Sequence, residues 1–148
     1  VCGLPCRCMD VTHQLGGENF VMWGGRDGYQ TLLNTDYKKE QDNYAAFLRL
    51  TAAYADKIGF TGQLLLEPKP REPAAHQYNF DAETTLGFLD HYKLTERFSL
   101  NLEANHGTLA GHSGEHEVEA ACSRGKLGSV RGRKVRAQSR AADAQPAR

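Results

Sequence analysis

The stretch that decides the fold is Leu64-Leu65-Leu66-Glu67-Pro68-Lys69-Pro70, a short apolar run that ends in an acid. A second stretch, Leu100-Asn101-Leu102-Glu103-Ala104-Asn105-His106, repeats this change. A leucine run bounded by turn residues is typical of a strand buried on both faces, as in a parallel sheet. In parallel α/β sheets, ligands bind beyond the carboxyl ends of the strands. The sequence therefore predicts that Glu67 and Glu103 point into one cleft.

The polar residues at these two strand ends are suited to hold a metal ion. Side chains alternate along a strand, so Glu67 and Lys69 share a face, and so do Glu103 and Asn105. His106 follows where the chain leaves the second strand. Carboxylates and an imidazole suit Mg, Mn or Co better than an ion that prefers thiolates. The alternative is that these are solvated loop residues, but the repetition on two strands favours the metal site.

Length and composition indicate one globular domain of 148 residues, long enough to bury a sizeable core. The sequence contains neither a membrane-spanning apolar run nor a visible signal peptide, so we expect no membrane partner. The chain begins at Val1 instead of a methionine, which suggests a fragment.

The net charge of zero hides two opposed blocks of sequence. Residues 123–148 contain eight Lys or Arg and one acid, Asp143, so they carry +7 and residues 1–122 carry −7. This asymmetry suggests two segments of different origin. We expect residues 131–148 to be a basic disordered tail, because they show no apolar period. The tail lacks interleaved aromatic residues, so no nucleic-acid partner is expected.

The four cysteines do not indicate a disulfide or zinc framework. Cys2, Cys6 and Cys8 crowd the N-terminus, whereas Cys122 is far along the chain. The C-x3-C-x-C spacing differs from the paired C-x2-C of a zinc site. We expect free thiols, and therefore a cytoplasmic location, and leave residues 1–8 without an assignment.

Strands and helices alternate along the rest of the chain. The expected strands cover residues 20–23, 63–67, 98–103 and 126–130, and the expected helices cover residues 9–15, 36–57, 82–92 and 115–121, with a loop at 107–114. This β-α-β-α-β-α order is typical of a TIM barrel with right-handed crossovers. A closed barrel needs eight units and about 250 residues. Residues 9–130 therefore predict an α/β fold, a partial TIM (β/α)8 barrel of three to four β-α units.

Several motifs strongly resemble xylose isomerase of the longer-chain class. They are Gly17-Glu18-Asn19-Phe20-Val21-Met22-Trp23-Gly24-Gly25-Arg26-Asp27-Gly28-Tyr29, Glu67-Pro68-Lys69-Pro70, His76-Gln77-Tyr78, Leu102-Glu103-Ala104-Asn105-His106 and Leu109-Ala110-Gly111-His112. The likeness runs from about Met9 to Ser129. It implies a homo-oligomeric TIM-barrel enzyme that interconverts D-xylose and D-xylulose, and in many members glucose and fructose.

The resemblance also implies roles for five residues. Glu67 resembles a ligand of the first of two divalent ions (Mg, Mn or Co), Glu103 the carboxylate shared by both, and His106 a ligand of the second. Lys69 resembles the ammonium that stabilises charge on the sugar's C1 oxygen, and Trp23 resembles a wall of the sugar pocket. A hydride shift needs stabilised charge on two neighbouring oxygens and the exclusion of water, which these groups can supply.

The chain departs from the family after Val130. The family has Asp-Ala-Asn there, whose Asp binds metal, but this sequence has Arg131-Gly132-Arg133. Later aspartate ligands are missing, as are the upstream His and Asp that open the sugar ring. We therefore expect a truncated isomerase that is inactive alone, and a shift of reading frame near Val130 is our hypothesis for the tail. The alternatives are another divalent-metal TIM-barrel enzyme, an endonuclease or sugar epimerase, and a non-catalytic fragment whose basic tail binds nucleic acid.

Overall fold

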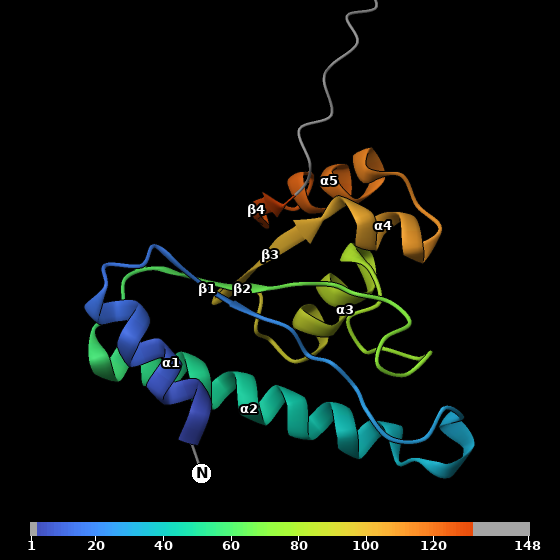
Figure 1. The fold of residues 1–148 in the computed structure, drawn as a ribbon, viewed down its shortest axis with the longest axis horizontal. Coiled ribbons are helices and arrows are strands. Elements are labelled where there is room, and N and C mark those ends of the chain that lie inside the picture. The colour runs from blue at the N-terminus through green and yellow to red at the C-terminus, as the bar shows by residue number, and fades with distance from the viewer. Residues whose placement is uncertain (1–2, 132–148) are drawn as a thin grey trace, which may run out of the picture.

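A computed structural model describes residues 3–131 and shows parallel strands connected by helices (Figure 1). The elements in chain order are α1 (Gly3–Gln14), β1 (Asn19–Met22), the 3-10 turn η1 (Leu32–Asn34), α2 (Tyr37–Ile58), β2 (Gln63–Leu66), α3 (Ala82–His91), β3 (Phe98–Glu103), α4 (Ala104–Ala110), α5 (Gly114–Cys122) and β4 (Leu127–Arg131). The predicted α/β class is confirmed.

The four strands form one sheet in the order in which they occur in the sequence, and each adjacent pair is parallel. Helix α2 connects β1 to β2, α3 connects β2 to β3, and α4 with α5 connects β3 to β4 (Figure 1). Because all strands run the same way, their carboxyl ends lie at a single edge of the sheet. Glu67 and Glu103 are therefore placed at that edge, on neighbouring strands.

The two faces of the sheet have different surroundings. Leu64, Leu66 and Leu100 are buried in one apolar cluster together with residues of α2 and α3, such as Leu48 and Leu86. The residues between them point to the opposite face because side chains alternate along a strand. On β2 and β3 this opposite face carries Leu65, Glu67, Asn101 and Glu103. The helices thus cover one face, and the predicted site residues lie on the other.

A bulge in β4 shows that the face opposite the helices is concave. Leu100 pairs with Leu127 and Asn101 with Ser129, so Gly128 is an extra residue in β4. A Cβ atom at Gly128 would collide with the side chain of Leu65 on β2, although β3 lies between these strands. Leu65 therefore reaches over β3, as expected when a sheet curves toward a barrel.

The structure corrects the loop predicted at residues 107–114, because α4 occupies residues 107–110 and α5 begins at Gly114. Asn105 and Gly107 are weak helix formers, which hides this helix in the sequence. Gly107 is buried because Glu117 of α5 packs against it, and a Cβ there would lie 2.8 Å from the Glu117 Cγ. Gly111 then ends the helix in the left-handed conformation, at φ 94°.

The N-terminal helix also differs from expectation. Helix α1 begins at Gly3, so it includes residues to which the sequence pattern assigned no structure. It packs against α2 with Met9 fully buried, and the Tyr54 hydroxyl donates to Asp10 over 2.7 Å. The expectation of free thiols is wrong for Cys6, which is disulfide-bonded, and holds for Cys8 and Cys122.

The predicted basic tail lies almost entirely beyond the part of the chain that the structure describes. Arg131 is the last residue of β4, and the rest of the predicted basic tail, residues 132–148, lies outside the described residues. Within residues 3–131, none of the helices has the length and apolar character needed to cross a membrane.

Candidate active site at the strand ends

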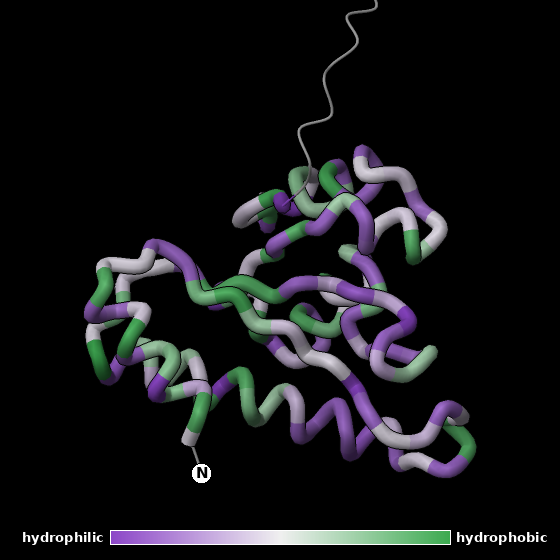
Figure 2. Tube along the Cα trace, in the orientation of Figure 1, coloured by the Kyte–Doolittle hydropathy of each residue, from purple (hydrophilic) through white to green (hydrophobic). Residues whose placement is uncertain are grey.

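The carboxyl ends of β2 and β3 carry most of the predicted site. In Figure 2 the hydrophobic colour of β2 changes to hydrophilic where the chain leaves the strand. Leu66 pairs with Leu100 of β3, and the backbone N–H of Glu67 donates to the Met22 carbonyl over 2.9 Å. This last hydrogen bond extends the β1–β2 ladder by one residue. The backbone of Glu67 is therefore fixed from one side by β1.

The Glu67 side chain is held by partners on β3 and α4. Asn101 donates from Nδ2 to Glu67 Oε2 over 2.6 Å, and His106 Nδ1 lies 3.5 Å from Glu67 Oε1. The Ser129 hydroxyl in turn donates to Asn101 Oδ1. A row of polar contacts thus runs from β4 through β3 to β2. It orients the Glu67 carboxylate, whose side chain remains 17% exposed.

His106, in the first turn of α4, is oriented by a backbone carbonyl. Its Nδ1 lies 3.0 Å from the Pro68 oxygen, and a carbonyl oxygen can only accept a hydrogen bond. Nδ1 therefore carries the proton of the neutral ring, and Nε2 keeps a lone pair. Metal-binding histidines are typically fixed in this way by a hydrogen bond from the nitrogen that does not bind the ion. The tautomer of His106 thus fits a metal ligand.

Glu103 has a different environment. It accepts a hydrogen bond of 3.3 Å from Asn105, and the Arg131 Nε lies 3.8 Å from its Oε2. Arg131 pairs with Glu103 in the β3–β4 register, although its side chain is 79% exposed. A guanidinium thus lies beside Glu103 at the position where the resemblance implies an aspartate ligand.

Lys69 and Trp23 lie together at the rim. The Lys69 Nζ is 5.0 Å from the centroid of the Trp23 ring and forms a 2.6 Å ion pair with Glu72. The hydrogen bond from Lys69 holds the pKa of Glu72 below its usual range. Trp23 is 46% exposed, so its ring is available to a ligand.

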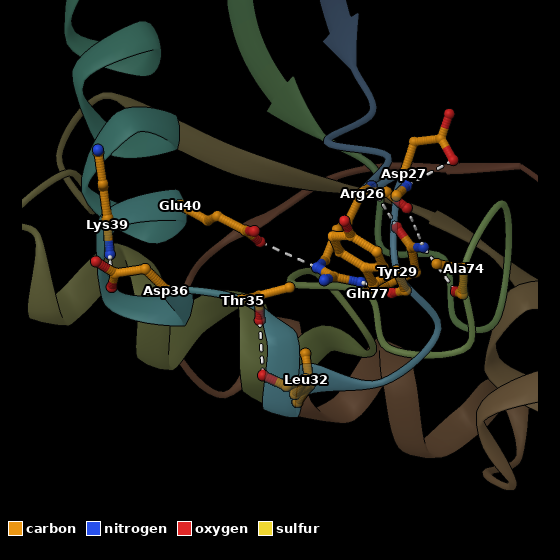
Figure 3. A network of polar contacts seen from close by, with 11 residues as sticks. Arg26, Asp27, Tyr29, Leu32, Thr35, Asp36, Lys39, Glu40, Ala74 and Gln77 are labelled. Carbon is orange, nitrogen blue, oxygen red and sulfur yellow. Dashed lines mark hydrogen bonds and ion pairs between the residues drawn. The ribbon is translucent and has the colours of Figure 1, made fainter.

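The loops that carry Lys69 and Trp23 are joined by a buried amide, Gln77 (Figure 3). The backbone N–H of Arg26 donates to Gln77 Oε1 over 2.6 Å, and Gln77 Nε2 donates to the Arg26 and Ala74 carbonyls over 2.8 and 2.7 Å. Arg26 is itself buried and its Nε donates to Glu40 on α2. The β1–α2 and β2–α3 loops are thereby fixed to each other.

A second anchor comes from Tyr44 on α2. Asn79 donates to the Tyr44 hydroxyl over 2.8 Å, and the Asn79 carbonyl accepts from the backbone N–H of Lys69, also over 2.8 Å. Burial raises the pKa of Tyr44 to about 12. The hydroxyl therefore stays neutral and fixes the segment that positions Lys69.

The donor set at the strand ends fits a divalent ion. Glu67, Glu103 and the free Nε2 of His106 are hard or borderline ligands, which suit Mg²⁺, Mn²⁺ and Co²⁺. Their ligand atoms are not gathered around one point, however. Among residues 3–131, the group of three whose ligand atoms all lie within 4.8 Å of one another is His112, His116 and Glu117.

This helix-end group, His112, His116 and Glu117, is not among the predicted site residues. Its one signal in the sequence is the H-x3-H spacing followed by an acid at Glu117. Burial raises the pKa of Glu117.

Comparison with curated proteins shows strong sequence similarity to part of a larger enzyme. The chain is 56% identical over 124 residues to a xylose isomerase of Thermotoga maritima, and 54% identical over 125 residues to one of Burkholderia cenocepacia. Each match covers 84% of this chain and 28% of the relative. The chain thus spans less than a third of the length of these relatives. No family model matches the sequence.

Solved structures support the fold. The chain superposes on a 3-keto-D-glucoside 4-epimerase from E. coli with a TM-score of 0.70 and 14% identity, over 86% of this chain and 48% of that one. A D-allulose 3-epimerase from Methylomonas sp. gives a TM-score of 0.67 and 22% identity, over 87% of this chain and 42% of that one. These likenesses show the fold alone and confirm a partial TIM barrel. The sequence identity goes further, and it shows that this chain is homologous to a segment of xylose isomerase, as its motifs predict.

Proposed function

We propose that the strand-end residues belong to a sugar isomerase that interconverts D-xylose and D-xylulose. The observation that carries this proposal is the convergence of His106, on α4, with Glu67 at the end of β2, where His106 Nδ1 lies 3.5 Å from Glu67 Oε1, within a segment 54–56% identical to xylose isomerases. The proposal includes D-glucose as a further substrate, a cytoplasmic location and a homo-oligomeric complete protein. The epimerase alternative is supported by fold alone.

The reaction moves a hydrogen with its electron pair from C2 to C1 of the open-chain sugar, and a proton from the C2 hydroxyl to the C1 oxygen. Divalent ions, when bound, would supply positive charge next to these two oxygens. Glu67, Glu103 and the Nε2 of His106 would hold the ions. The other groups act on the substrate directly.

Lys69 and Trp23 have separate roles in this proposal. The Lys69 ammonium would stabilise the charge that develops on the C1 oxygen, and a fixed cation of this kind contributes most where water is excluded. Trp23 would supply an apolar wall that keeps water from the moving hydride. Their contact, 5.0 Å from Nζ to ring centroid, supports this proposal because the cation and the ring lie side by side at the rim.

We propose that this chain is inactive by itself. Glu67, Glu103 and His106 are too few ligands to fix two ions, and Arg131 places a competing cation 3.8 Å from Glu103. The test is an assay of ketose formation from D-xylose with added Mg²⁺ or Co²⁺, for which no turnover is expected. Measurable turnover would refute the inactivity.

The isomerase assignment itself is tested with a chimera. The aligned segment of the Thermotoga maritima relative is replaced by that of this chain, which keeps the remaining ligands in place. We expect D-xylose isomerisation within about tenfold of the parent, and a loss of about 10³-fold or more when Glu67→Gln or Lys69→Met is introduced, as when preorganised charge is removed. A chimera that folds with the parent's melting temperature but has no activity would show that the assignment is wrong.

A further inference from the structure

We propose that His112, His116 and Glu117 form a metal site of their own, between the N-terminal ends of α3 and α5, which binds a transition-metal dication such as Zn²⁺. This site is separate from the strand-end group, which consists of Glu67, Glu103 and His106, and it does not depend on the proposed isomerase function. It is argued from four observations: the spacing of the ligand atoms, an unpartnered buried oxygen, the orientation of one ring, and the access to the site.

The ligand atoms are already close together. One atom from each of the three residues lies within 4.8 Å of the other two. The His112 and His116 rings stack with their centroids 4.3 Å apart and their planes at 20°. His112 lies just before the Ser113 cap of α5, and His116 is in the first turn, so the backbone of a single short segment holds both rings. Small side-chain rotations would suffice to close the group on an ion.

Glu117 supplies the unpartnered buried oxygen. The residue is 4% exposed, and its Oε2 accepts a hydrogen bond of 2.9 Å from the backbone N–H of Ala82 at the start of α3. Within residues 3–131 no hydrogen-bond donor reaches its other oxygen, Oε1, which is buried. A buried carboxylate oxygen without a partner is costly. A cation at the two imidazoles would satisfy it.

The His112 ring is oriented for binding. Its Nε2 lies 3.2 Å from Asp81 Oδ2. An ionised carboxylate can only accept a hydrogen bond, so Nε2 carries the proton of the neutral ring and the lone pair is on Nδ1. Asp81 is itself fixed as the N-cap of α3 by a 2.7 Å hydrogen bond from the Thr84 N–H. A carboxylate behind a histidine is the usual support of a metal-binding imidazole.

Charge and access also favour a cation. A third carboxylate, Glu83, lies 3.9 Å from the Nε2 of His116, so the two imidazoles are surrounded by Asp81, Glu83 and Glu117. His116 is exposed and lines a surface pocket of about 230 Å³ together with Glu83, so this ligand can be reached from solvent. Two imidazoles and one carboxylate are the ligands of three-residue zinc sites that keep a fourth position for water. Mg²⁺, which prefers oxygen ligands, should bind here poorly.

The test uses the full chain with Glu67→Gln and His106→Asn, so that the strand-end group cannot contribute. Co²⁺ is titrated and followed by its visible absorption, and Zn²⁺ is then added in competition. We expect one equivalent of bound ion, and a loss of affinity of about tenfold or more for His112→Asn, His116→Asn or Glu117→Gln. The exposed His76→Asn, which leaves the site intact, is the matched control and should bind as before.

Three results would overturn the proposal. They are unchanged affinity in the folded variants, a loss of affinity in the His76→Asn control, and a thiolate-to-cobalt absorption band, which would assign the ion to a cysteine. If the variants do not fold, the histidine ¹H–¹⁵N NMR signals of the unsubstituted chain decide instead. Zn²⁺ should shift the signals of His112 and His116 and leave those of His76 and His91 in place. Shifts confined to other histidines would overturn the assignment.

Discussion

The strand-end group and the helix-end group contain the same kinds of side chain but differ in how their polar atoms are satisfied. At the strand ends, Glu67 accepts from Asn101 and Glu103 lies beside Arg131, so protein groups already occupy the carboxylates. At the helix ends, Glu117 keeps a buried oxygen without a partner among the described residues. The first group is assembled across strands, whereas the second comes mainly from one short segment.

This difference shows how far each group depends on the rest of a barrel. In a barrel, the ligands at the strand ends come from several different strands. A four-stranded piece therefore contributes only some of them. The helix-end group needs α3, α5 and the loop before α5, all of which are present. Substitutions that affect one group and spare the other can therefore test the comparison.

The largest effect is expected for Asn101→Asp. It replaces the donor 2.6 Å from Glu67 with a second carboxylate, at a position that is 6% exposed. Two like charges in contact and partly desolvated should lower the free energy of unfolding at pH 7 by about 2–4 kcal/mol. This loss in the free energy of unfolding should become smaller as the pH falls, because the folded variant binds more protons than the unfolded one. Added Mg²⁺ should shrink it too, if Glu67 is a metal ligand.

Urea denaturation followed by circular dichroism, from pH 4 to 8 and with or without Mg²⁺, measures this effect. The matched control is Asn43→Asp, an exposed position on α2, which should change the free energy by no more than about 0.5 kcal/mol. Zn²⁺ affinity at the helix-end group should be unchanged by Asn101→Asp. An Asn101→Asp protein as stable as the parent at pH 7 would mean that Glu67 and Asn101 are not in contact.

The strand-end group was accessible to prediction because its signals are local. A leucine run followed by Glu67 and Lys69 predicts both the strand and the face on which the polar residues lie. The pairing of β2 with β3 adds only which strand lies beside it. Helix α4 was not accessible in this way. The stability of α4 depends on Glu117 packing against Gly107, a contact that local helix propensity does not contain.

The helix-end group was missed for a related reason. The H-x3-H spacing places His112 and His116 together, but the residues that make this spacing informative come from elsewhere. Asp81 orients His112 across 31 positions of sequence, and Ala82 holds Glu117 across 35. The three residues come from one stretch, but the contacts with α3 that orient His112 and bury Glu117 are tertiary, and that stretch alone does not reveal them.

A smaller effect is expected for Tyr44→Phe, which removes the anchor of the segment that carries Lys69. Loss of the hydrogen bond from Asn79 should cost about 1–2 kcal/mol at pH 7, because Asn79 is buried. The pKa of Tyr44 is about 12 in the folded chain and about 10 in the unfolded one. Its contribution to stability is therefore complete below pH 10 and is lost as the pH rises from 10 to 12.

The difference in free energy of unfolding between the parent and Tyr44→Phe should accordingly decrease over that pH range. Chemical denaturation at pH 7, 9, 10, 11 and 12 measures it. Tyr29→Phe, an exposed control, should differ from the parent by a small and constant amount. A parent–variant difference that stays constant from pH 9 to 12 would contradict a buried, neutral Tyr44.

The smallest effect on stability, and the most direct test of the strand-end group, is expected for Arg131→Ala. Its ion pair with Glu103 is long and the arginine is largely exposed, so the free energy of unfolding should change by less than about 0.5 kcal/mol. Divalent-ion affinity should rise about two- to fivefold, because a competing cation beside Glu103 is removed. Mn²⁺ titration followed by electron paramagnetic resonance measures this rise.

Arg124→Ala, which removes an exposed arginine 3.5 Å from Asp90, is the control for net charge and should leave Mn²⁺ affinity unchanged. Equal gains in both variants would mean that the effect comes from the overall field of the chain, and Glu103 would then lose its place as a ligand.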